Sequence, residues 1–269
     1  PAPMLKPRRR RTEMLSLKDK IVFVTGASSG IGQAAAEAFA ALGARVLMCA
    51  RRTDRLETLA RRLETAHKVP VHPFGLDVRD RAAVDAAVAA LPADWRAVDV
   101  LVNNAGLSRG LDKLPGGLVS DWEEMIDTNV KGLLYVSRAV VPGMVARGEG
   151  HIINVGSIAG HEVYPNGNVY CATKHAVDAI TKGLRLDLNG TPIRVSTVDP
   201  GLVETEFSMV RFHGDTTRAG KTYQGLKPLE AADIAEAIVW VATRPAHVQV
   251  AEVVILPVAQ ASVTMVHRK

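Results

Sequence analysis

The sequence predicts a single α/β domain built on a doubly wound parallel sheet. Short apolar runs rich in β-branched residues alternate along the chain with longer amphipathic segments, as expected of parallel strands joined by crossover helices. The chain has 269 residues, which is enough for one such domain with a large core. Because no linker or internal repeat interrupts the alternation, we expect one folded unit over residues 18–269.

The first half of the chain is expected to hold four strands, each followed by a helix. Lys20–Thr25 (KIVFVT) shows the strand pattern clearly, since a short apolar, β-branched run predicts a buried strand. Expected strands are Lys20–Thr25, Arg45–Ala50, Val71–Leu76 and Val98–Asn103, and expected helices are Gln33–Leu42, Asp54–Ala66, Ala82–Leu91 and Ser120–Val145. The last helix contains Pro142, which predicts a break near Pro142–Gly143.

The second half continues the alternation. The expected strands are His151–Val155, Ile193–Val198 and Glu252–Leu256, and the expected helices are Gly167–Asn189 and Glu230–Thr243. Residues 201–227 form the least regular stretch, which is long for a loop. We expect it to contain short helices and to act as a substrate loop or lid.

Gly26–Gly32 (GASSGIG) joins the first strand to the first helix, with the spacing Gly-x-x-x-Gly-x-Gly. Glycines let the backbone approach a ligand closely, and the free N–H groups at a helix start attract anions. The order of strand, glycine loop and helix therefore predicts a Rossmann-type fold with a dinucleotide pyrophosphate at this turn. A tight turn without a ligand is the simpler alternative.

The formal net charge of +5 raises the question of a nucleic-acid partner. The first 20 residues hold seven Lys and Arg against two acids, and the rest of the chain holds 26 of each sign. We expect residues 1–17 to be a flexible basic arm, or an over-long start upstream of Met14. A nucleic-acid partner is therefore not expected, although weak, salt-sensitive binding of polyanions by the arm stays open.

Other features bound the function class. No apolar run reaches the length of about twenty residues that a membrane span needs, and residues 1–12 lack the apolar stretch of a secretory signal. Two cysteines, Cys49 and Cys171, make no disulfide framework and fit a cytoplasmic protein. Cys171 has no dedicated base in the sequence, so a packing role is simpler than a nucleophilic one. The eight histidines show no metal-ligand spacing, and no metal is expected.

Ser157, Tyr170 and Lys174 form the strongest functional pattern. Tyr170 and Lys174 lie four residues apart on an expected helix and share one face. A Lys ammonium beside a phenol lowers the pKa of the phenol toward working pH, where a proton donor or acceptor is most effective. Ser157 follows the strand His151–Val155, which places its hydroxyl at the carboxyl end of the sheet. Taken alone, a Tyr-x-x-x-Lys pair is usually a surface neighbour pair, so the other motifs must support it.

The second expected strand ends in Arg51 and Arg52, with no carboxylate. In this fold an acid at that position binds the adenosine ribose of NAD, whereas an arginine accommodates the 2′-phosphate of NADP. NADP is therefore the expected cofactor. The simpler alternative is that one of the two arginines is merely solvated.

These motifs, in this order, resemble the short-chain dehydrogenase/reductase family from about residue 18 to the C-terminus. The matching stretches are Thr25–Gly32 (TGASSGIG), Asp77–Val78, Asn103–Gly106 (NNAG), Asn129, Ser157, Tyr170–Lys174 and Pro200–Gly201. The resemblance is closest to the NADP-dependent 3-hydroxy acid (L-allo-threonine, serine) dehydrogenases, on Leu91–Trp95 (LPADW), Met125–Asn129 (MIDTN), Gly201–Phe207 (GLVETEF) and Val210–Asp215 (VRFHGD). Some members of that subgroup carry one more residue between Val203 and Thr205.

The resemblance implies an enzyme that transfers hydride reversibly between NADP and a secondary alcohol or carbonyl. It implies that Tyr170 is the general acid/base, that Lys174 lowers the pKa of Tyr170 and binds the nicotinamide ribose, and that Ser157 binds the substrate oxygen. The glycine loop, the arginine pair and the resemblance together give the expected cofactor-binding residues Gly26, Ser28, Ser29, Gly30, Ile31, Arg51, Arg52, Asp77, Val78, Asn104, Ala105, Tyr170, Lys174, Pro200, Gly201, Val203 and Thr205. A homotetramer is also implied.

Asn129 is the fourth catalytic candidate. It falls on the apolar stripe of its expected helix, and a buried polar side chain needs partners. The backbone nearby would satisfy it in the simplest case. The resemblance instead implies a proton relay from Lys174 to solvent through a water held by this helix.

A 3-hydroxy acid substrate needs a partner for its carboxylate, and a fork-shaped guanidinium is the natural choice. Arg211 in the substrate loop is favoured, and Arg109, which follows the Asn103–Gly106 turn, is the second candidate. Both could instead be solvated. Because fold and catalytic residues do not fix a substrate, a reductase of another carbonyl (acyl-carrier-protein, steroid or sugar type) stays open, as does a catalytically silent NADP-binding regulator.

Overall fold

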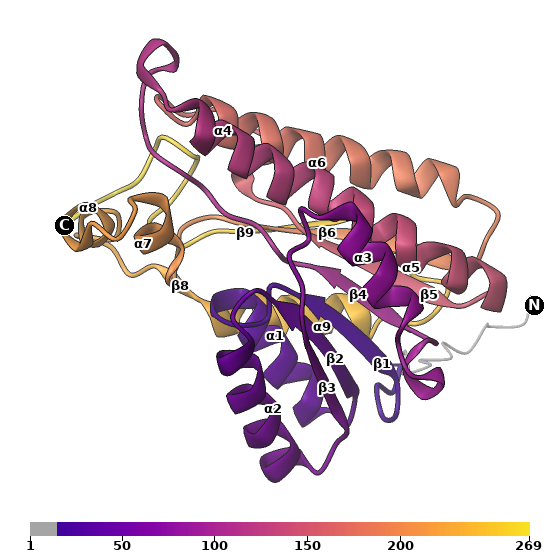
Figure 1. The fold of residues 1–269 in the computed structure, drawn as a ribbon. Helices are drawn as coiled ribbons and strands as arrows, with labels where there is room; N and C mark the ends of the chain where they lie inside the picture. The colour runs from indigo at the N-terminus through magenta and orange to yellow at the C-terminus, as the bar shows by residue number, and fades with distance from the viewer. Residues whose placement is uncertain (1–14) are drawn as a thin grey trace, which may run out of the picture.

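The computed structural model describes residues 15–269, which fold around a seven-stranded parallel sheet (Figure 1). Its strands are β1 (Ile21–Thr25), β2 (Arg45–Ala50), β3 (Val71–Gly75), β4 (Val100–Asn103), β5 (Gly150–Val155), β6 (Ile193–Pro200) and β9 (Glu252–Ile255). Their order is β3-β2-β1-β4-β5-β6-β9. The winding reverses between β1 and β4, and ligands of such sheets bind beyond the carboxyl ends of the strands at this switch point. The predicted Rossmann-type sheet is confirmed.

Helices cover both faces of the sheet (Figure 1). One face is covered by α1 (Gly30–Ala41), α2 (Thr53–His67) and α9 (Ala231–Ala242), and the other by α3 (Arg81–Ala89), α4 (Val119–Ile126), α5 (Leu133–Arg147) and α6 (Asn168–Asp187). Side chains of a strand alternate between the two faces. In β1, Val22 and Val24 pack with the first layer, and Ile21 and Phe23 pack with the second. Two apolar layers therefore hold the strand ends that carry the site.

The long helix predicted over Ser120–Val145 is interrupted at a different place from the one expected. Pro142 lies inside α5 without breaking it. The irregularity is instead a π-helical turn, Asp127–Gly132, between α4 and α5. A π-turn adds one residue to a helical turn and requires no proline or other particular residue type, so no single residue marks it in the sequence. π-turns often occur at functional sites, and this one contains Asn129.

The substrate loop contains short helices, as predicted. It holds β7 (Val203–Glu204), α7 (Phe207–Arg211) and α8 (Thr216–Lys221), and β8 (Leu229–Glu230) pairs with β7 in parallel. The C-terminus lies beside α8 (Figure 1). There Arg268 donates to the carbonyl of Gln224 at 2.6 Å, so the C-terminal segment contacts the substrate loop.

The folded unit begins before residue 18. Leu15 donates its N–H to the carbonyl of Thr243 at 2.9 Å, and Leu17 is buried in the core. Residues 15–17 are therefore not part of a flexible arm, and the rest of the predicted arm, residues 1–14, lies outside the described residues. None of the helices in the described part of the chain is long and apolar enough to cross a membrane.

Candidate active site

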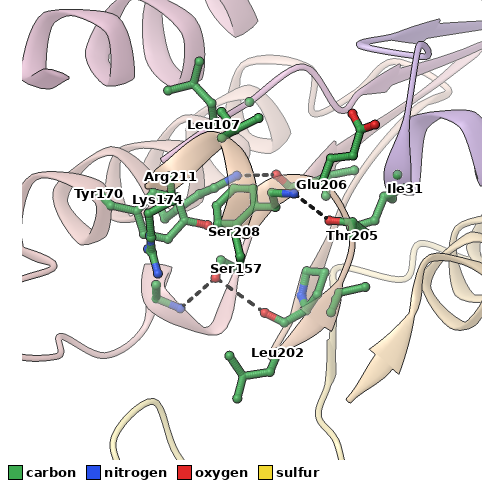
Figure 2. Close-up of a pocket in the computed structure, with 18 of the residues that line it drawn as sticks. Ile31, Leu107, Ser157, Tyr170, Lys174, Leu202, Thr205, Glu206, Ser208 and Arg211 are labelled. Atoms are coloured by element: carbon green, nitrogen blue, oxygen red, sulfur yellow. Dashed lines mark hydrogen bonds between the residues drawn. The ribbon is translucent and has the colours of Figure 1, made fainter. Parts of the chain in front are cut away.

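A pocket of about 820 Å³ opens at the carboxyl ends of β1, β4, β5 and β6 (Figure 2). The substrate loop closes one side of it through Phe207, Arg211 and Tyr223. With the exception of Asn129, every residue predicted for catalysis, cofactor binding or substrate binding lines this pocket. The fold thus gathers residues as far apart in the chain as Gly26 and Arg211.

The glycine loop has the geometry of an anion site. Gly26 and Gly30 have positive φ angles of 67° and 55°, which favour glycine. A Cβ at Gly26 would lie 2.8 Å from the Cα of Ala105, so the loop also needs glycine to approach the turn after β4. Ser29, the N-cap of α1, makes no side-chain cap. The first N–H groups of α1 are therefore not capped by Ser29 and can receive a phosphate.

The turn after β4 is fixed against the glycine loop. Asn104 donates from Nδ2 to the carbonyl of Thr25 at 2.9 Å, and the N–H groups of Asn104 and Ala105 donate to Thr25 Oγ1 at 3.1 and 3.0 Å. The two predicted cofactor segments thus form one rigid wall.

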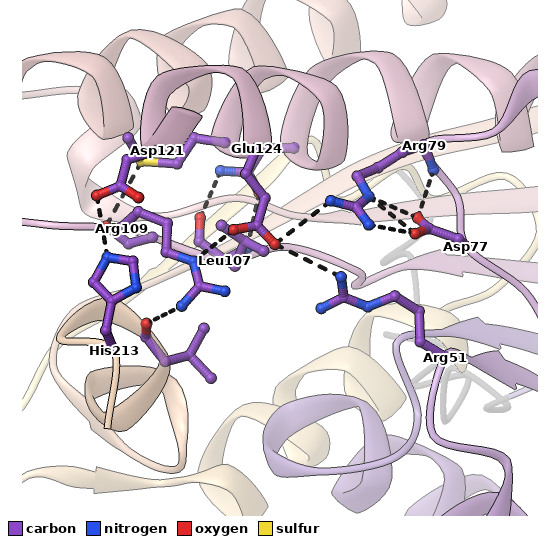
Figure 3. Close-up of polar contacts among 12 residues, drawn as sticks. Arg51, Asp77, Arg79, Leu107, Arg109, Asp121, Glu124 and His213 are labelled. Atoms are coloured by element: carbon purple, nitrogen blue, oxygen red, sulfur yellow. Dashed lines mark hydrogen bonds and ion pairs between the residues drawn. The ribbon is translucent and has the colours of Figure 1, made fainter. Parts of the chain in front are cut away.

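Basic residues gather at the end of β2, beyond the glycine loop. Arg52 donates from Nη2 to Ser29 Oγ at 2.7 Å and to Ser28 Oγ at 3.1 Å. Arg51 is turned toward Glu124, at 3.6 Å (Figure 3). Arg55, which the sequence reading did not single out, adds a third guanidinium on the first turn of α2 and pairs with Glu206 at 2.7 Å. Arg52 therefore contacts the glycine loop directly, and Arg51 does not.

Asp77 and Val78 follow β3 and border the same end of the pocket. The Asp77 carboxylate is bound by Arg79, with Nη2 to Oδ2 at 2.6 Å, and the hydrogen bond from Arg79 is the main reason that the pKa of Asp77 is lowered (Figure 3). Val78 packs against Gly132 of the π-turn, where a Cβ would lie 2.7 Å from the Val78 side chain. This contact ties the end of the pocket near Asp77 to the turn that holds Asn129.

Ser157 lies at the carboxyl end of β5, as predicted, and Asp199 supports it from behind. Asp199 Oδ1 accepts from the Ser157 N–H at 3.1 Å and from Thr197 Oγ1 at 2.8 Å. Its Oδ2 faces His161 Nε2 at 3.3 Å, and Glu252 lies 3.7 Å from the same nitrogen. Burial raises the pKa of Asp199. These three groups lie close enough together to hold a cation, and neither His161 Nε2 nor Asp199 Oδ2 has a hydrogen-bond partner among the described residues.

Tyr170 is 9% exposed and packs edge-on against Phe207, with ring centroids 5.7 Å apart. Burial raises the pKa of its hydroxyl, and hydrogen bonding to Ser157 and the charge of Arg211 only partly oppose this. The expected lowering of the Tyr170 pKa by Lys174 is therefore wrong for this geometry. Cys171 beside it is fully buried, and burial also raises the pKa of its thiol, which fits a packing role.

Lys174 is buried, and its Nζ donates to the carbonyl of Val155 at 2.9 Å. Burial lowers the pKa of Lys174 to about 8, while Asp199 acts in the opposite direction. The four-residue spacing correctly predicted that Lys174 and Tyr170 share a face. It did not predict that the lysine points to the end of β5, because spacing does not specify side-chain direction.

Asn129 lies next to the pocket and is 2% exposed. Its Oδ1 accepts from the Leu107 N–H at 2.8 Å, and its Nδ2 donates to the Leu107 carbonyl at 2.8 Å and to Thr173 Oγ1 at 3.0 Å. A Cβ built on Gly106 would meet Asn129 Oδ1 at 3.2 Å and Lys174 Nζ at 3.8 Å. Because Gly106 has no side chain, the space between Asn129 Oδ1 and Lys174 Nζ stays open.

The two arginines predicted for substrate differ in their surroundings. Arg211 donates from Nε to Ser108 Oγ at 2.9 Å and from Nη2 to the hydroxyl of Tyr164, both of which are neutral groups. Arg109 pairs with Glu124 at 2.6 Å and donates to the carbonyl of Val210 at 2.5 Å (Figure 3). Arg109 thus already has an anionic partner.

The residues present fit a nicotinamide dinucleotide that carries a 2′-phosphate. Open N–H groups at the start of α1 suit a pyrophosphate, and the guanidinium of Arg52 lies on the serines of the loop. Lys174, Tyr170 and Ser157 meet at the opposite end of the pocket.

Known proteins with the same architecture allow the chain to be classified. The short chain dehydrogenase family matches residues 20–215. The NADP-dependent 3-hydroxy acid dehydrogenase YdfG of Salmonella typhimurium is 51% identical over 250 residues, covering 92% of this chain and 99% of that protein. The sulfoacetaldehyde reductase of Chromohalobacter salexigens is 47% identical over 241 residues, covering 89% and 94%.

A solved structure agrees with these relatives. The closed form of a serine dehydrogenase complexed with NADP⁺ superposes with a TM-score of 0.86 at 47% identity, covering 93% of this chain and 100% of the other. Together with the glycine loop and the meeting of Ser157, Tyr170 and Lys174 in one pocket, these matches show that the chain belongs to the short-chain dehydrogenase/reductase family.

Proposed function

We propose that this chain is an NADP-dependent oxidoreductase that acts reversibly on the CH–OH group of a small 3-hydroxy acid, such as L-allo-threonine, serine or 3-hydroxypropionate. The observation that carries this proposal is the position of Arg211 beside Tyr170 in the pocket. Within residues 15–269, no carboxylate lies within ion-pairing distance of Arg211, so its charge is available to a substrate. A buried carboxylate requires such a partner.

Tyr170 exchanges the proton with the substrate oxygen. It donates its proton to the carbonyl oxygen during reduction and accepts one during oxidation. Because burial raises the pKa of Tyr170, the hydroxyl is protonated at neutral pH, which is the form that reduction needs. Ser157 donates a hydrogen bond to the same oxygen and stabilises the charge that develops there.

When bound, NADP supplies the carbon centre that gives or takes the hydride. Lys174 would hold the nicotinamide ribose. The Asn129 side chain is bonded to the Leu107 backbone, and a water held by this helix would complete a proton relay from Lys174 to solvent. Asn104 and Ala105 would line the ribose side of the cofactor, and Pro200–Thr205 would contact the nicotinamide carboxamide. All of these residues except Glu204 line the pocket. Arg51 and Arg52 bind the 2′-phosphate, with Asp77 and Val78 at the adenine.

A substrate panel tests this function. The purified protein is given NADP⁺ with 3-hydroxybutyrate, 3-hydroxypropionate, serine and L-allo-threonine, and with 1,3-butanediol and 1,3-propanediol as neutral analogues of similar size. We expect kcat/KM to be higher for the acids than for the matched diols. Equal values for acid and diol would remove the argument from Arg211, and absence of turnover with every substrate would favour a silent NADP-binding regulator.

A second candidate substrate is a small sulfonate aldehyde or alcohol. The relative from Chromohalobacter salexigens is named a sulfoacetaldehyde reductase, and a sulfonate offers the same anionic oxygens to a guanidinium. Sulfoacetaldehyde with NADPH is therefore included in the panel. An acyl-carrier-protein, steroid or sugar substrate would be favoured by activity that does not depend on a small acidic group.

We also propose a cytoplasmic homotetramer. The assembly is what the family resemblance implies, and native mass spectrometry measures it. The expectation of a reducing compartment is supported by Cys49 and Cys171, which are free and buried.

A further inference from the structure

Glu206 lies between two arginines at the ribose end of the pocket. Its Oε2 lies 2.8 Å from Arg52 Nη1 and its Oε1 lies 2.7 Å from Arg55 Nη1. Each carboxylate oxygen thus has its own guanidinium. These hydrogen bonds are also the main reason that the pKa of Glu206 is lowered, so the carboxylate stays ionised at neutral pH.

The same arginine connects Glu206 to the glycine loop. While Nη1 of Arg52 holds the acid, Nη2 holds Ser28 Oγ and Ser29 Oγ at 3.1 and 2.7 Å. The carboxylate therefore occupies the position of an anion against a guanidinium that also faces the phosphate-binding turn. A 2′-phosphate on the ribose needs the same N–H donors.

Glu206 also belongs to the substrate loop. It is the N-cap of α7, and the next residue, Phe207, packs against the ring of Tyr170. Arg211 is the last residue of the same helix. One ion pair thus joins the ribose end of the pocket to the helix that carries the proposed substrate anchor.

We propose that Glu206 is a specificity-determining residue that competes with the 2′-phosphate for Arg52 and Arg55 and holds α7 until that phosphate is bound. The proposal rests on the NADP dependence proposed above. A phosphate carries about twice the charge of a carboxylate and offers three oxygens, so it displaces Glu206 from the arginines. A cofactor without the 2′-phosphate has nothing to exchange and leaves the ion pairs closed.

The contrary possibility is that Glu206 merely orients Arg52 for the phosphate. The two roles predict opposite signs. If the acid competes, its removal strengthens binding of a 2′-phosphate, and if it orients Arg52, its removal weakens binding.

The test uses Glu206→Gln and two nucleotides that lack the nicotinamide, so that binding is measured without turnover. Isothermal titration calorimetry gives the Kd of adenosine 2′,5′-bisphosphate and of 5′-AMP. We expect Glu206→Gln to bind the bisphosphate about threefold or more tightly than wild type, which is within the range reached by exposed ion pairs, and to leave the Kd of 5′-AMP unchanged.

Glu37→Gln is the matched control. Glu37 on α1 accepts from Arg62 on α2 and from Gln33, so the same amide substitution removes one charge nearby without touching the pocket. We expect no selective gain for the bisphosphate in this variant. An equal gain would show that net charge alone is responsible, and would overturn the proposal.

Hydrogen exchange of residues 206–212 tests the connection to α7. Without ligand, Glu206→Gln should exchange faster there than wild type and Glu37→Gln should not. In wild type the bisphosphate should produce the same increase, and 5′-AMP should not.

Weaker bisphosphate binding by Glu206→Gln, or unchanged exchange in that variant, would overturn the proposal. If wild type does not bind the bisphosphate more tightly than 5′-AMP, both the NADP assignment and the role of Glu206 fail. If wild type prefers the bisphosphate and Glu206→Gln does not change its Kd, only the competition by Glu206 is refuted.

Discussion

The guanidinium of Arg211 lies over the ring of Tyr170, with its central carbon 5.2 Å from the ring centroid (Figure 2). This contact places a cation beside the proposed proton donor. It also stabilises the phenolate form, although burial outweighs it. A substrate that presents its oxygen to Tyr170 therefore has a positive charge within reach of an acidic substituent.

Arg211→Ala should raise KM for a 3-hydroxy acid by about tenfold or more, which corresponds to about 1.4 kcal/mol or above. The charge-assisted hydrogen bonds to the carboxylate are lost, whereas a neutral diol of similar size never forms them. Steady-state kinetics with 3-hydroxybutyrate and 1,3-butanediol measure the difference. Equal damage to both substrates would show that Arg211 only supports the loop through Ser108 and Tyr164.

Arg109→Ala is the matched comparison for this prediction. Because Arg109 pairs with Glu124 and holds the Val210 carbonyl, its removal should affect acid and diol alike. A loss confined to the acid would make Arg109 the anchor in place of Arg211.

Tyr170→Phe should retain the fold and NADPH binding but lose turnover by a factor of about 10²–10⁴. The ring keeps its contact with Phe207, and only the titratable hydroxyl is removed. Circular dichroism and NADPH fluorescence check fold and binding, and single-turnover kinetics check the chemical step. Near-normal turnover of the pure variant would exclude Tyr170 as the proton donor.

Arg52→Ala should lower the ratio of kcat/KM for NADPH to that for NADH by about tenfold, the value of one lost charge-assisted hydrogen bond. Arg51→Ala should lower this ratio less, because Arg51 faces Glu124 rather than the serines of the glycine loop. The double replacement should show the largest effect. An unchanged ratio in all three variants would place the discrimination elsewhere, with Arg55 as the next residue to replace.

Much of the site could be predicted because many of its residues lie at or just after the ends of apolar strand runs, which are easy to find in the sequence. The apolar runs fixed strand ends to within a few residues. Gly26, Asn104 and Ser157 follow such ends, and Pro200 is the last residue of β6. The carboxyl ends of parallel strands lie at one edge of the sheet. Residues found at these ends in the sequence could therefore be predicted to lie close together.

Contacts between distant charged side chains could not be predicted in this way. Glu206 meets Arg52 across 154 positions of the chain, and Asp199 meets Ser157 across 42. Neither contact produces a periodic pattern in the sequence. The first depends on how the substrate loop folds back, and the second on the position of the end of β6. The direction of a side chain could not be predicted either. Nothing in the sequence indicated that Lys174 bonds to the carbonyl of Val155.

Lys174 gives the stability of the protein a specific pH dependence. Burial lowers its pKa from 10.5 to about 8. Below about pH 8 the lysine is protonated in both states, and the cost of burying its charge is fully present. Between about pH 8 and 10.5 the unfolded chain holds the proton and the folded protein releases it, so the free energy of unfolding rises with pH.

Lys174→Met removes this titration, so the unfolding free energy of wild type should rise relative to that of the variant by up to about 1.4 kcal/mol per pH unit across this window. Urea titrations at pH 7, 8, 9 and 10 measure the difference. Lys182→Met on the same helix is the control: Lys182 is exposed and paired with Asp178 at 2.7 Å, which raises its pKa, so its difference from wild type should stay flat over this range. If the curves of wild type and Lys174→Met run parallel, Lys174 keeps an ordinary pKa in the folded protein, and the charge on this side of the pocket does not change within the working pH range.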